Sequence, residues 1–300
     1  MLKVAWRPEY VLPLPEGHRF PMAKYDLIPD QLLYEGTLLP EQIFQPGPMS
    51  DKDLLLTHTL AYWQKLQSQT LSPQEIRKNG FPLSEALIFR EICINQGTVD
   101  AVLYAQQYGI AMNIAGGTHH AYADRGEGFC IMNDFACAAN LMLHAGKARR
   151  ILIVDLDVHQ GNGTAAIFQN EPRVFTFSMH GASNYPMHKE KSDLDIPLPD
   201  GTEDGSFLSL LESHLPKLIA LHTPDLIFYL SGVDVLSTDK LGRLSLSREG
   251  CKQRDAYVLD TCMRHGIPVV VAMGGGYSTD LRDIVEAHCN TFRIASSLVY

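Results

Sequence analysis

The sequence lacks the features of a disulfide-stabilised, exported or membrane-spanning protein. Its 300 residues include only six cysteines and no Cys-x-x-Cys pair, a pattern that favours reduced, buried thiols over a disulfide framework. The first residues contain no continuous apolar segment of signal-peptide length. No stretch approaches the roughly 18 apolar residues that are needed to cross a bilayer. We therefore expect a cytoplasmic protein with no membrane span.

An excess of positive charge is also absent. The chain has 25 lysines and arginines against 34 aspartates and glutamates, a formal net charge of −9. Proteins that bind nucleic acid directly present a basic surface, so we expect no direct nucleic-acid binding. The same acidity does not exclude a basic substrate, such as a cationic peptide.

Internal repeats, low-complexity segments and long polar linkers are missing as well. The composition, 45% hydrophobic and 20% charged, is that of an ordinary globular protein. We interpret the proline-rich start as an irregular segment, and residues 45–50 and 69–82 as loops. Nothing in the sequence requires a domain boundary, so we predict a single domain over residues 1–300.

Apolar runs alternate with helix-like segments along the chain. Five runs have the character of buried strands: residues 109–115, 150–154, 174–178, 226–230 and 269–273. Three intervening segments favour helices: residues 135–144, 207–221 and 248–265. This alternation predicts an α/β fold, with a parallel sheet covered by helices on both faces. Functional sites in such sheets form beyond the carboxyl ends of the strands.

The segment ILIVDLDVHQGNG, residues 151–163, is the strongest chemical signal. If the strand continues, Asp155, Asp157 and His159 point to one side, because strand side chains alternate. Buried charges must be paired or bound to a metal, so Asp157 and His159 are plausible ligands of a divalent ion. Asp234, after the strand-like segment LIFYLSGV, is the best third ligand. Taken alone, an aspartate after a strand is more commonly a turn or cap residue.

Two further motifs follow predicted strands. In NIAGGTHH, the adjacent His119 and His120 could be metal ligands, a base with its electrostatic partner, or surface residues. Their place at a strand's carboxyl end favours a general base. In MGGGY, the glycines leave room against the backbone, and the motif lacks the lysine and hydroxyl residue of a phosphate-binding loop. Tyr277 could donate to a developing oxyanion, although a single tyrosine is more often a packing residue.

Two loops each present an aromatic side chain. Phe129 lies in GEGFC and Tyr185 in NYP. Facing each other, these rings could form a slot for a narrow aliphatic chain. Taken singly, each is more simply a packing residue.

Together these motifs resemble the zinc-dependent histone deacetylase family of the arginase/deacetylase superfamily. GGTHHA, GFC, DLDVHQGNG, SGVD and GGGY occur in the family's order within residues 16–278. DRGEGFC, DVHQGNG, GTEDG and DKLGRLSLS are most similar to the class IV branch and its bacterial relatives. The resemblance implies a three-layer α/β/α domain with a central, mostly parallel sheet of roughly eight strands.

The resemblance also implies a mechanism. Asp157, His159 and Asp234 become the ligands of one catalytic zinc ion, which polarises an amide carbonyl and activates a water molecule. His120 becomes the general base, and His119 its electrostatic partner. The donor set also accepts ferrous iron.

The remaining roles are implied in the same way. Tyr277 stabilises the tetrahedral oxyanion, and Asp155 orients His119 while binding a structural K⁺ or Na⁺ together with Ser178. Asn162 stands where class I members carry an aspartate. A neutral amide stabilises imidazolium less than a carboxylate does, so the neighbouring histidine should be less basic.

An acyl-lysine channel and an exit cavity complete the implied site. The channel is lined by Phe129, Tyr185, Gly128, Gly275 and Gly276. Tyr185 replaces the more usual phenylalanine and adds a hydroxyl at the mouth. Arg19 matches an arginine near the internal cavity through which acetate leaves.

Several alternatives stay open. Arginase-like ureohydrolases need carboxylates at positions that are Gly161 and Gly232 in this chain, which argues for one metal ion rather than two. A non-catalytic acyl-lysine binder is a rival, although no expected ligand is missing. The substrate is an acylated lysine in a protein or peptide, with acetyl or longer acyl groups, or else a small acetylated amine such as an acetylpolyamine. No insertion typical of polyamine specialists is present, so a protein or peptide is preferred.

Overall fold

An eight-stranded sheet organises residues 1–299, which are those that the computed structural model describes. The strand order is β2-β1-β3-β8-β7-β4-β5-β6, and every neighbouring pair is parallel. The strands are β1 (Lys3–Ala5), β2 (Ile43–Phe44), β3 (Ile110–Asn113), β4 (Ile151–Asp155), β5 (Val174–Gly181), β6 (Leu194–Leu198), β7 (Leu226–Leu230) and β8 (Val269–Ala272). The predicted α/β fold with a parallel sheet is therefore confirmed.

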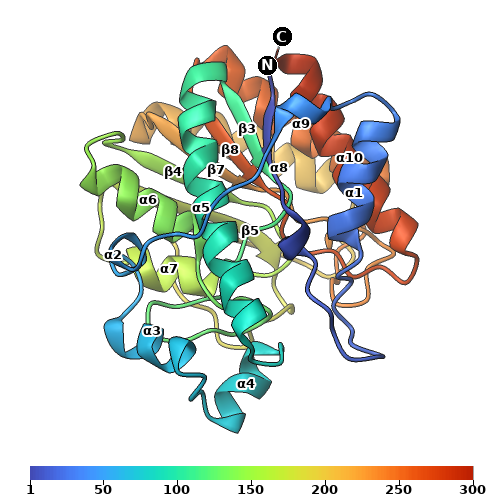
Figure 1. Ribbon diagram of the computed structural model, residues 1–300. Helices are drawn as coiled ribbons and strands as arrows, with labels where there is room; N and C mark the ends of the chain where they lie inside the picture. Colours follow the sequence, from blue (N-terminus) through green and yellow to red (C-terminus); the bar gives the residue numbers. More distant parts are fainter. Residues whose placement is uncertain (300) are drawn as a thin grey trace.

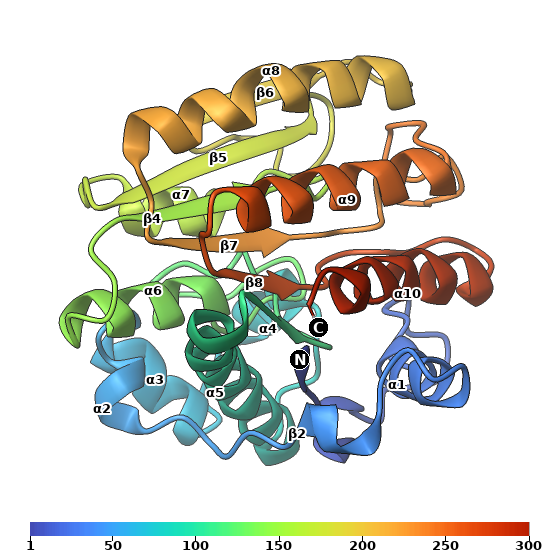
Figure 2. The same ribbon diagram turned by 90° about the horizontal axis from the view of Figure 1, so that it is seen from above.

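Helices cover both faces of the sheet (Figures 1 and 2). One face carries α5 (Glu85–Tyr108), α6 (Asp134–His144) and α7 (Asn162–Phe168), and the other carries α8 (Asp204–His222), α9 (Arg248–Arg264) and α10 (Leu281–Leu298). The helices of the first 80 residues, α1 (Lys24–Tyr34), α2 (Asp51–Leu54), α3 (Leu60–Gln67) and α4 (Pro73–Asn79), lie outside these two layers. The result is the expected three-layer α/β/α arrangement.

The central strands are apolar because both of their faces are covered. Every residue of β3, β4, β7 and β8 is buried, as is usual for parallel strands between two helical layers. The apolar and aromatic side chains of β4 and β7 therefore supply much of the core. Their first polar residues appear only where the strands end, and that edge of the sheet carries the candidate site.

Two segments differ from the sequence-based expectation. The predicted loop over 69–82 contains α4, which starts with a reciprocal cap between Ser72 and Glu75 and has Pro73 in its first turn. Both features are helix-start signals. The N-terminal segment is not wholly irregular, because Lys3–Ala5 forms β1 between β2 and β3. A strand of three residues is too short to show an alternating pattern.

The cysteines and the helices bear on two sequence-based expectations, the one of buried thiols and the one of no membrane span. All six cysteines are free and buried, in agreement with the predicted buried thiols. Among residues 1–299, no helix combines the length and the apolar character needed to span a bilayer.

Candidate active site

The candidate site lies where four adjacent strands end. The order β3-β8-β7-β4 places the segments after these strands along one edge of the sheet. His119 and His120 follow β3, Tyr277 follows β8, Asp234 follows β7, and Asp157 follows β4. Parallel strands deliver residues that are far apart in sequence to the same edge, and this is how the motifs meet.

Asp157, His159 and Asp234 form a buried cluster. One potential ligand atom from each lies within 4.8 Å of the others. The Nδ1 atom of His159 is 3.1 Å from Asp157 Oδ1 and 3.2 Å from Asp234 Oδ2. Backbone N–H groups hold the two carboxylates: Gly275 donates to Asp157 Oδ2 at 2.8 Å, and Val158 donates to Asp234 Oδ1 at 3.0 Å. The three side chains are thus preorganised around one point.

The electrostatics of this cluster favour a cation. Burial and the neighbouring Asp157 raise the pKa of Asp234 to about 7, and Asp234 Oδ2 is buried without a hydrogen-bond donor. Two crowded carboxylates and one imidazole nitrogen are a donor set that suits a divalent ion such as Zn²⁺. The residues present therefore fit a metal ion. A bound cation would offset the repulsion between the carboxylates of Asp157 and Asp234.

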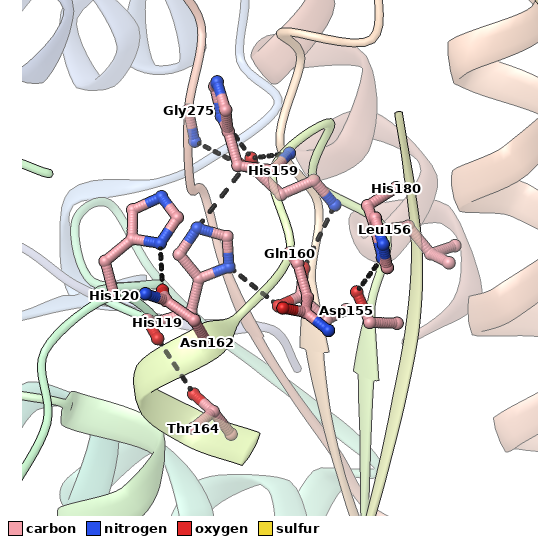
Figure 3. A network of polar contacts seen from close by, with 12 residues as sticks. His119, His120, Asp155, Leu156, His159, Gln160, Asn162, Thr164, His180 and Gly275 are labelled. Carbon is pink, nitrogen blue, oxygen red and sulfur yellow. Dashed lines mark hydrogen bonds and ion pairs between the residues drawn. The ribbon is translucent and has the colours of Figure 1, made fainter. Parts of the chain in front are cut away.

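His119 and His120 lie side by side and face different partners (Figure 3). His119 Nδ1 is 2.7 Å from Asp155 Oδ2, and His120 Nδ1 is 2.6 Å from Asn162 Oδ1. The two imidazoles are therefore oriented by one carboxylate and one neutral amide. The Nε2 atom of His119 lies 3.9 Å from Asp157 Oδ1, which places the pair against the metal-ligand cluster.

The two histidines differ in basicity as a result. Burial disfavours the imidazolium form of His119, but the charges of Asp155 and Asp157 outweigh burial and raise its pKa. Burial, together with the charges of His119 and His159, lowers the pKa of His120 well below its usual value. His120 is therefore the neutral member of the pair, and its ring nitrogen that does not face Asn162 is available to accept a proton.

Tyr277 borders the same space. Burial, followed by the charges of Asp234 and Asp157, raises the pKa of the Tyr277 phenol well above its usual value, so the phenol keeps its proton and can donate it in a hydrogen bond. Asp239 fixes the Tyr277 backbone, because its Oδ2 accepts from the Tyr277 N–H at 2.5 Å.

Two pockets meet at these side chains. The inner pocket has a volume of about 40 Å³ and is bordered by the metal-ligand cluster, His119, His120 and Tyr277. The outer pocket has a volume of about 430 Å³ and is bordered by His120, His159 and Tyr277 as well. Phe129 and Gly128 border both pockets, and Tyr185 borders the outer one. The predicted wall residues Phe129, Gly128 and Tyr185 thus lie where a narrow chain would enter.

The glycines after β8 have a different use from the expected one. A Cβ atom on Gly275 would lie 1.9 Å from Asp234 Oδ2, so this glycine makes room for the Asp234 carboxylate. Gly275 borders the inner pocket, but Gly276 borders neither pocket. The Cβ position of Gly276 is closed by Val233 at 2.6 Å. The assignment of Gly276 to the channel was therefore wrong, because that residue packs behind the site.

Arg19 also lies elsewhere than expected. It is exposed and borders the outer pocket, with its guanidinium 5.5 Å from the centre of the Phe129 ring. The arginine at the inner pocket is Arg90 of α5, which is buried and donates to Tyr10 O at 2.7 Å. Placing Arg19 at an internal exit cavity was wrong, because the segment before α1 runs along the mouth of the site.

Ser178 and Asp155 are neighbours across β4 and β5, where they are direct register partners. Both border a cavity of about 10 Å³, which is of the order of one water-sized particle. The Oγ atom of Ser178 also lies 2.9 Å from His180 Nδ1. The two residues proposed for a monovalent cation are therefore adjacent.

Sequence reasoning missed Glu127, a buried residue of the GEGFC loop. Its Oε1 accepts from Asn162 Nδ2 at 2.6 Å and from the Tyr185 hydroxyl at 2.8 Å, and its Oε2 lies 2.5 Å from Lys78 Nζ. Burial opposes the charge of Glu127, but these three donors lower its pKa. The carboxylate therefore joins the channel wall to the partner of His120. The sequence feature that could have indicated this role is a glutamate between glycines in a loop that otherwise contains small and aromatic residues.

Arg254 of α9 was missed too, although it supports the metal-ligand cluster from behind. Its Nη1 donates to Leu156 O at 3.0 Å and to Gly232 O at 2.7 Å, next to the two loops that carry the carboxylates. Asp255 pairs with it at 2.8 Å, and both side chains are fully buried. In the sequence, Arg254 is part of an Arg-Asp pair within a polar helix. Such a pair is typical of a solvent-exposed helix surface, so the pattern does not indicate burial.

Comparison with known proteins places this geometry in a family. The model of the histone deacetylase domain matches residues 18–292. The chain belongs to the histone deacetylase family. Members of this family are hydrolases that act on amide bonds, so the chain is assigned to that class of enzyme.

The individual relatives span bacteria and plants. The chain is 44% identical to an uncharacterised protein of Picosynechococcus sp. over 292 residues, 97% of each chain. It is 30% identical to histone deacetylase 2 of Arabidopsis thaliana, over 87% of this chain and 70% of that protein. It is also 30% identical to the acetoin utilization protein AcuC of Staphylococcus aureus, over 92% and 77% respectively.

A solved structure agrees with the fold. The crystal structure of an HDAC homolog complexed with SAHA superposes with a TM-score of 0.86 at 25% identity. The match covers 99% of this chain and 84% of that one. The three-layer architecture is therefore shared along nearly the whole length.

Proposed function

We propose that this chain is a zinc-dependent amidohydrolase that removes acetyl groups from lysine side chains of proteins or peptides. One observation carries the proposal. The buried cluster Asp157, His159 and Asp234 lies at the base of a pocket that also presents a proton acceptor, His120, and a protonated phenol, Tyr277. Metal-assisted hydrolysis of an amide uses a bound ion, a proton acceptor and an oxyanion donor within reach of one carbonyl.

The metal would be held by the two carboxylates and by His159. A divalent ion at this point would polarise the amide carbonyl and lower the pKa of a water molecule. The pocket accepts one substrate chain from the outer side, between Phe129 and Tyr185. A single ion is expected, because Gly161 and Gly232 stand where a second ion would need carboxylates.

Each protein group then has one task. His120 accepts the proton of the attacking water through the nitrogen that does not face Asn162. Tyr277 donates a hydrogen bond to the oxygen that becomes negative in the tetrahedral intermediate. His119, held by Asp155, keeps positive charge beside His120 and supports the return of a proton to the leaving amine. The amine leaves protonated, and the acid product remains in the inner pocket.

The size of the inner pocket bears on the acyl group. A volume of about 40 Å³ suits a group of acetyl size, and a long acyl chain would need the pocket to enlarge. We therefore place acetyl-lysine first and longer acyl groups second. A structural K⁺ or Na⁺ beside Asp155 and Ser178 is part of the same proposal, and ferrous iron is the alternative ion at the catalytic site.

The test is a panel of acyl-lysine peptides from acetyl to myristoyl, assayed with acetylated polyamines on metal-loaded protein. We expect hydrolysis of the acetyl peptide, with kcat/KM falling as the chain lengthens. Faster turnover of an acetylpolyamine than of every peptide would replace the substrate class. Stoichiometric metal binding with no hydrolysis of any substrate would show a non-catalytic acyl-lysine binder.

A further inference from the structure

The mouth of the outer pocket carries positive charge on a protein whose net charge is −9. Its border includes two cationic side chains, Arg19 and Lys78. No aspartate or glutamate of residues 1–299 borders it. The polarity of this opening is therefore opposite to that of the molecule as a whole.

Arg19 is the stronger contributor because its charge is not neutralised. Its guanidinium lies 5.5 Å from the centre of the Phe129 ring, an arrangement that orients the group without removing its charge. Within the described chain, no carboxylate forms an ion pair with Arg19. An exposed guanidinium held over an aromatic wall retains its planar set of donors for an incoming carboxylate.

Lys78 adds a second, partly compensated charge. It pairs with Glu127 at 2.5 Å, but the two partners differ in exposure: 52% of the Lys78 side chain and 4% of the Glu127 side chain are accessible. Glu127 is also turned toward Asn162 and Tyr185. The Glu127 carboxylate therefore lies inside the wall, while much of the Lys78 side chain is exposed at the border of the outer pocket.

This charge distribution discriminates between the substrates that the catalytic groups alone would accept. An acetylated polyamine carries one or more ammonium groups close to the acetylated nitrogen, and these would meet Arg19 and Lys78. Like charges that approach within a few ångströms in a partly desolvated opening repel each other, and opposite charges also raise the rate of association. A basic peptide segment has the same disadvantage as a polyamine.

We propose that the outer pocket selects acyl-lysine peptides with an acidic residue next to the acylated lysine, and rejects polyamines and basic flanking sequences. This inference rests on the proposed function and names the substrate class of the same site. Arg19 is the residue that determines specificity, and Lys78 supports it. Neither touches the reacting amide.

The experiment uses three acetyl-lysine peptides that differ only in the two flanking residues, which are aspartate, glutamine or lysine. The metal-loaded protein is assayed with each peptide and with acetylspermidine. We expect kcat/KM to be about 10-fold higher for the aspartate peptide than for the glutamine peptide, and lower again for the lysine peptide and acetylspermidine. Added salt should compress these ratios because the charges are exposed.

Variants of Arg19 locate the effect. Arg19→Gln should bring the aspartate-to-lysine ratio close to one, Arg19→Lys should retain most of it, and Arg19→Glu should invert it. The matched control is Arg149→Gln. Arg149 is exposed and precedes β4, at the opposite edge of the sheet, so its loss should leave all ratios unchanged.

The outcomes separate this inference from the proposed function. Equal kcat/KM for the three peptides, or a preference for the lysine peptide, would overturn the inference. Hydrolysis of these peptides would still support the proposed function. A full aspartate preference in Arg19→Glu would also overturn it. Hydrolysis of none of the substrates would instead remove the proposed function.

Discussion

The floor and the rim of the pocket are built on opposite principles. The floor consists of the three candidate metal ligands with His119 and His120, all buried and each fixed by a neighbour at hydrogen-bond distance. The rim consists of Arg19, Lys78, Tyr185 and Leu241, which come from separate segments and are partly or fully exposed. Charges are crowded and desolvated at the floor, and solvated at the rim.

This difference predicts how each region responds to change. Removing one partner of a buried charge cluster leaves the others uncompensated and costs several kcal/mol. An exposed charge interacts through water and is worth much less. Floor variants should therefore alter metal binding, turnover or stability strongly, whereas rim variants should alter the choice of substrate by modest factors.

The largest effect is expected for Asp234→Ala. The change deletes a carboxylate that borders the inner pocket and faces His159 at 3.2 Å, so the divalent ion should be lost and kcat/KM should fall by about 1,000-fold or more. Metal content after dialysis, measured together with turnover, checks this prediction. A fully metallated variant would show that Asp234 is not a ligand.

Tyr277→Phe should come next and should separate chemistry from metal binding. Only a hydroxyl is removed, so the metal content should equal that of the wild type, while kcat should fall by about 100- to 1,000-fold as for the loss of one oxyanion donor. The comparison uses the same metal and activity assays. Near-normal turnover would leave Tyr277 with a packing role only.

Arg254→Met tests the support beneath the floor. Asp255 would stay buried without its cation, and the carbonyl groups of Leu156 and Gly232 would lose their donor. The free energy of unfolding should fall by about 3–5 kcal/mol. Denaturant titration measures this loss. The exposed Arg149→Gln variant is the control and should change stability by about 0.5 kcal/mol or less; equal stability losses for both would break the contrast.

Glu127→Gln lies at the boundary of the two regions, and its effect should be intermediate to small. The substitution keeps the size of the side chain but removes the charge that Asn162, Tyr185 and Lys78 share. Outer partners of catalytic groups are typically worth 10- to 100-fold, and we expect about 10-fold in kcat with metal content unchanged. Tyr185→Phe, which removes one of the three donors, should cost less than Glu127→Gln. A larger loss of kcat for Tyr185→Phe than for Glu127→Gln would show that the channel wall, and not Asn162, transmits the effect on turnover.

The floor was largely predictable because its residues follow strands that are visible in the sequence. The run ILIVD predicts β4, but the strand ends at Asp155, so Asp157 and His159 lie in the bend after it and not on one face of a continued strand. Asp234 could be paired with them only because parallel strands end at a common edge. Gly276 was misplaced for a local reason: a glycine shows that space is needed, but not whether substrate or a neighbouring side chain fills it.

The rim could not be predicted in the same way. Arg19, Lys78 and Leu241 come from three segments that are distant in sequence, and their proximity depends on how these segments pack. Even the helix that ends beside Lys78 was interpreted as a loop, although its Ser72–Glu75 cap was readable. Likewise, β1 is a strand because it pairs with β2 and β3. Its own three residues carry too little pattern to predict it.

Amide hydrolysis by this chain should require one divalent ion held by Asp157, His159 and Asp234. The most direct measurement is to strip the protein with a chelator and return Zn²⁺ in steps while following hydrolysis of an acetyl-lysine peptide. Activity should vanish on stripping and rise linearly to a break at one ion per chain. Full activity in the stripped protein, or a break at two ions, would contradict the account.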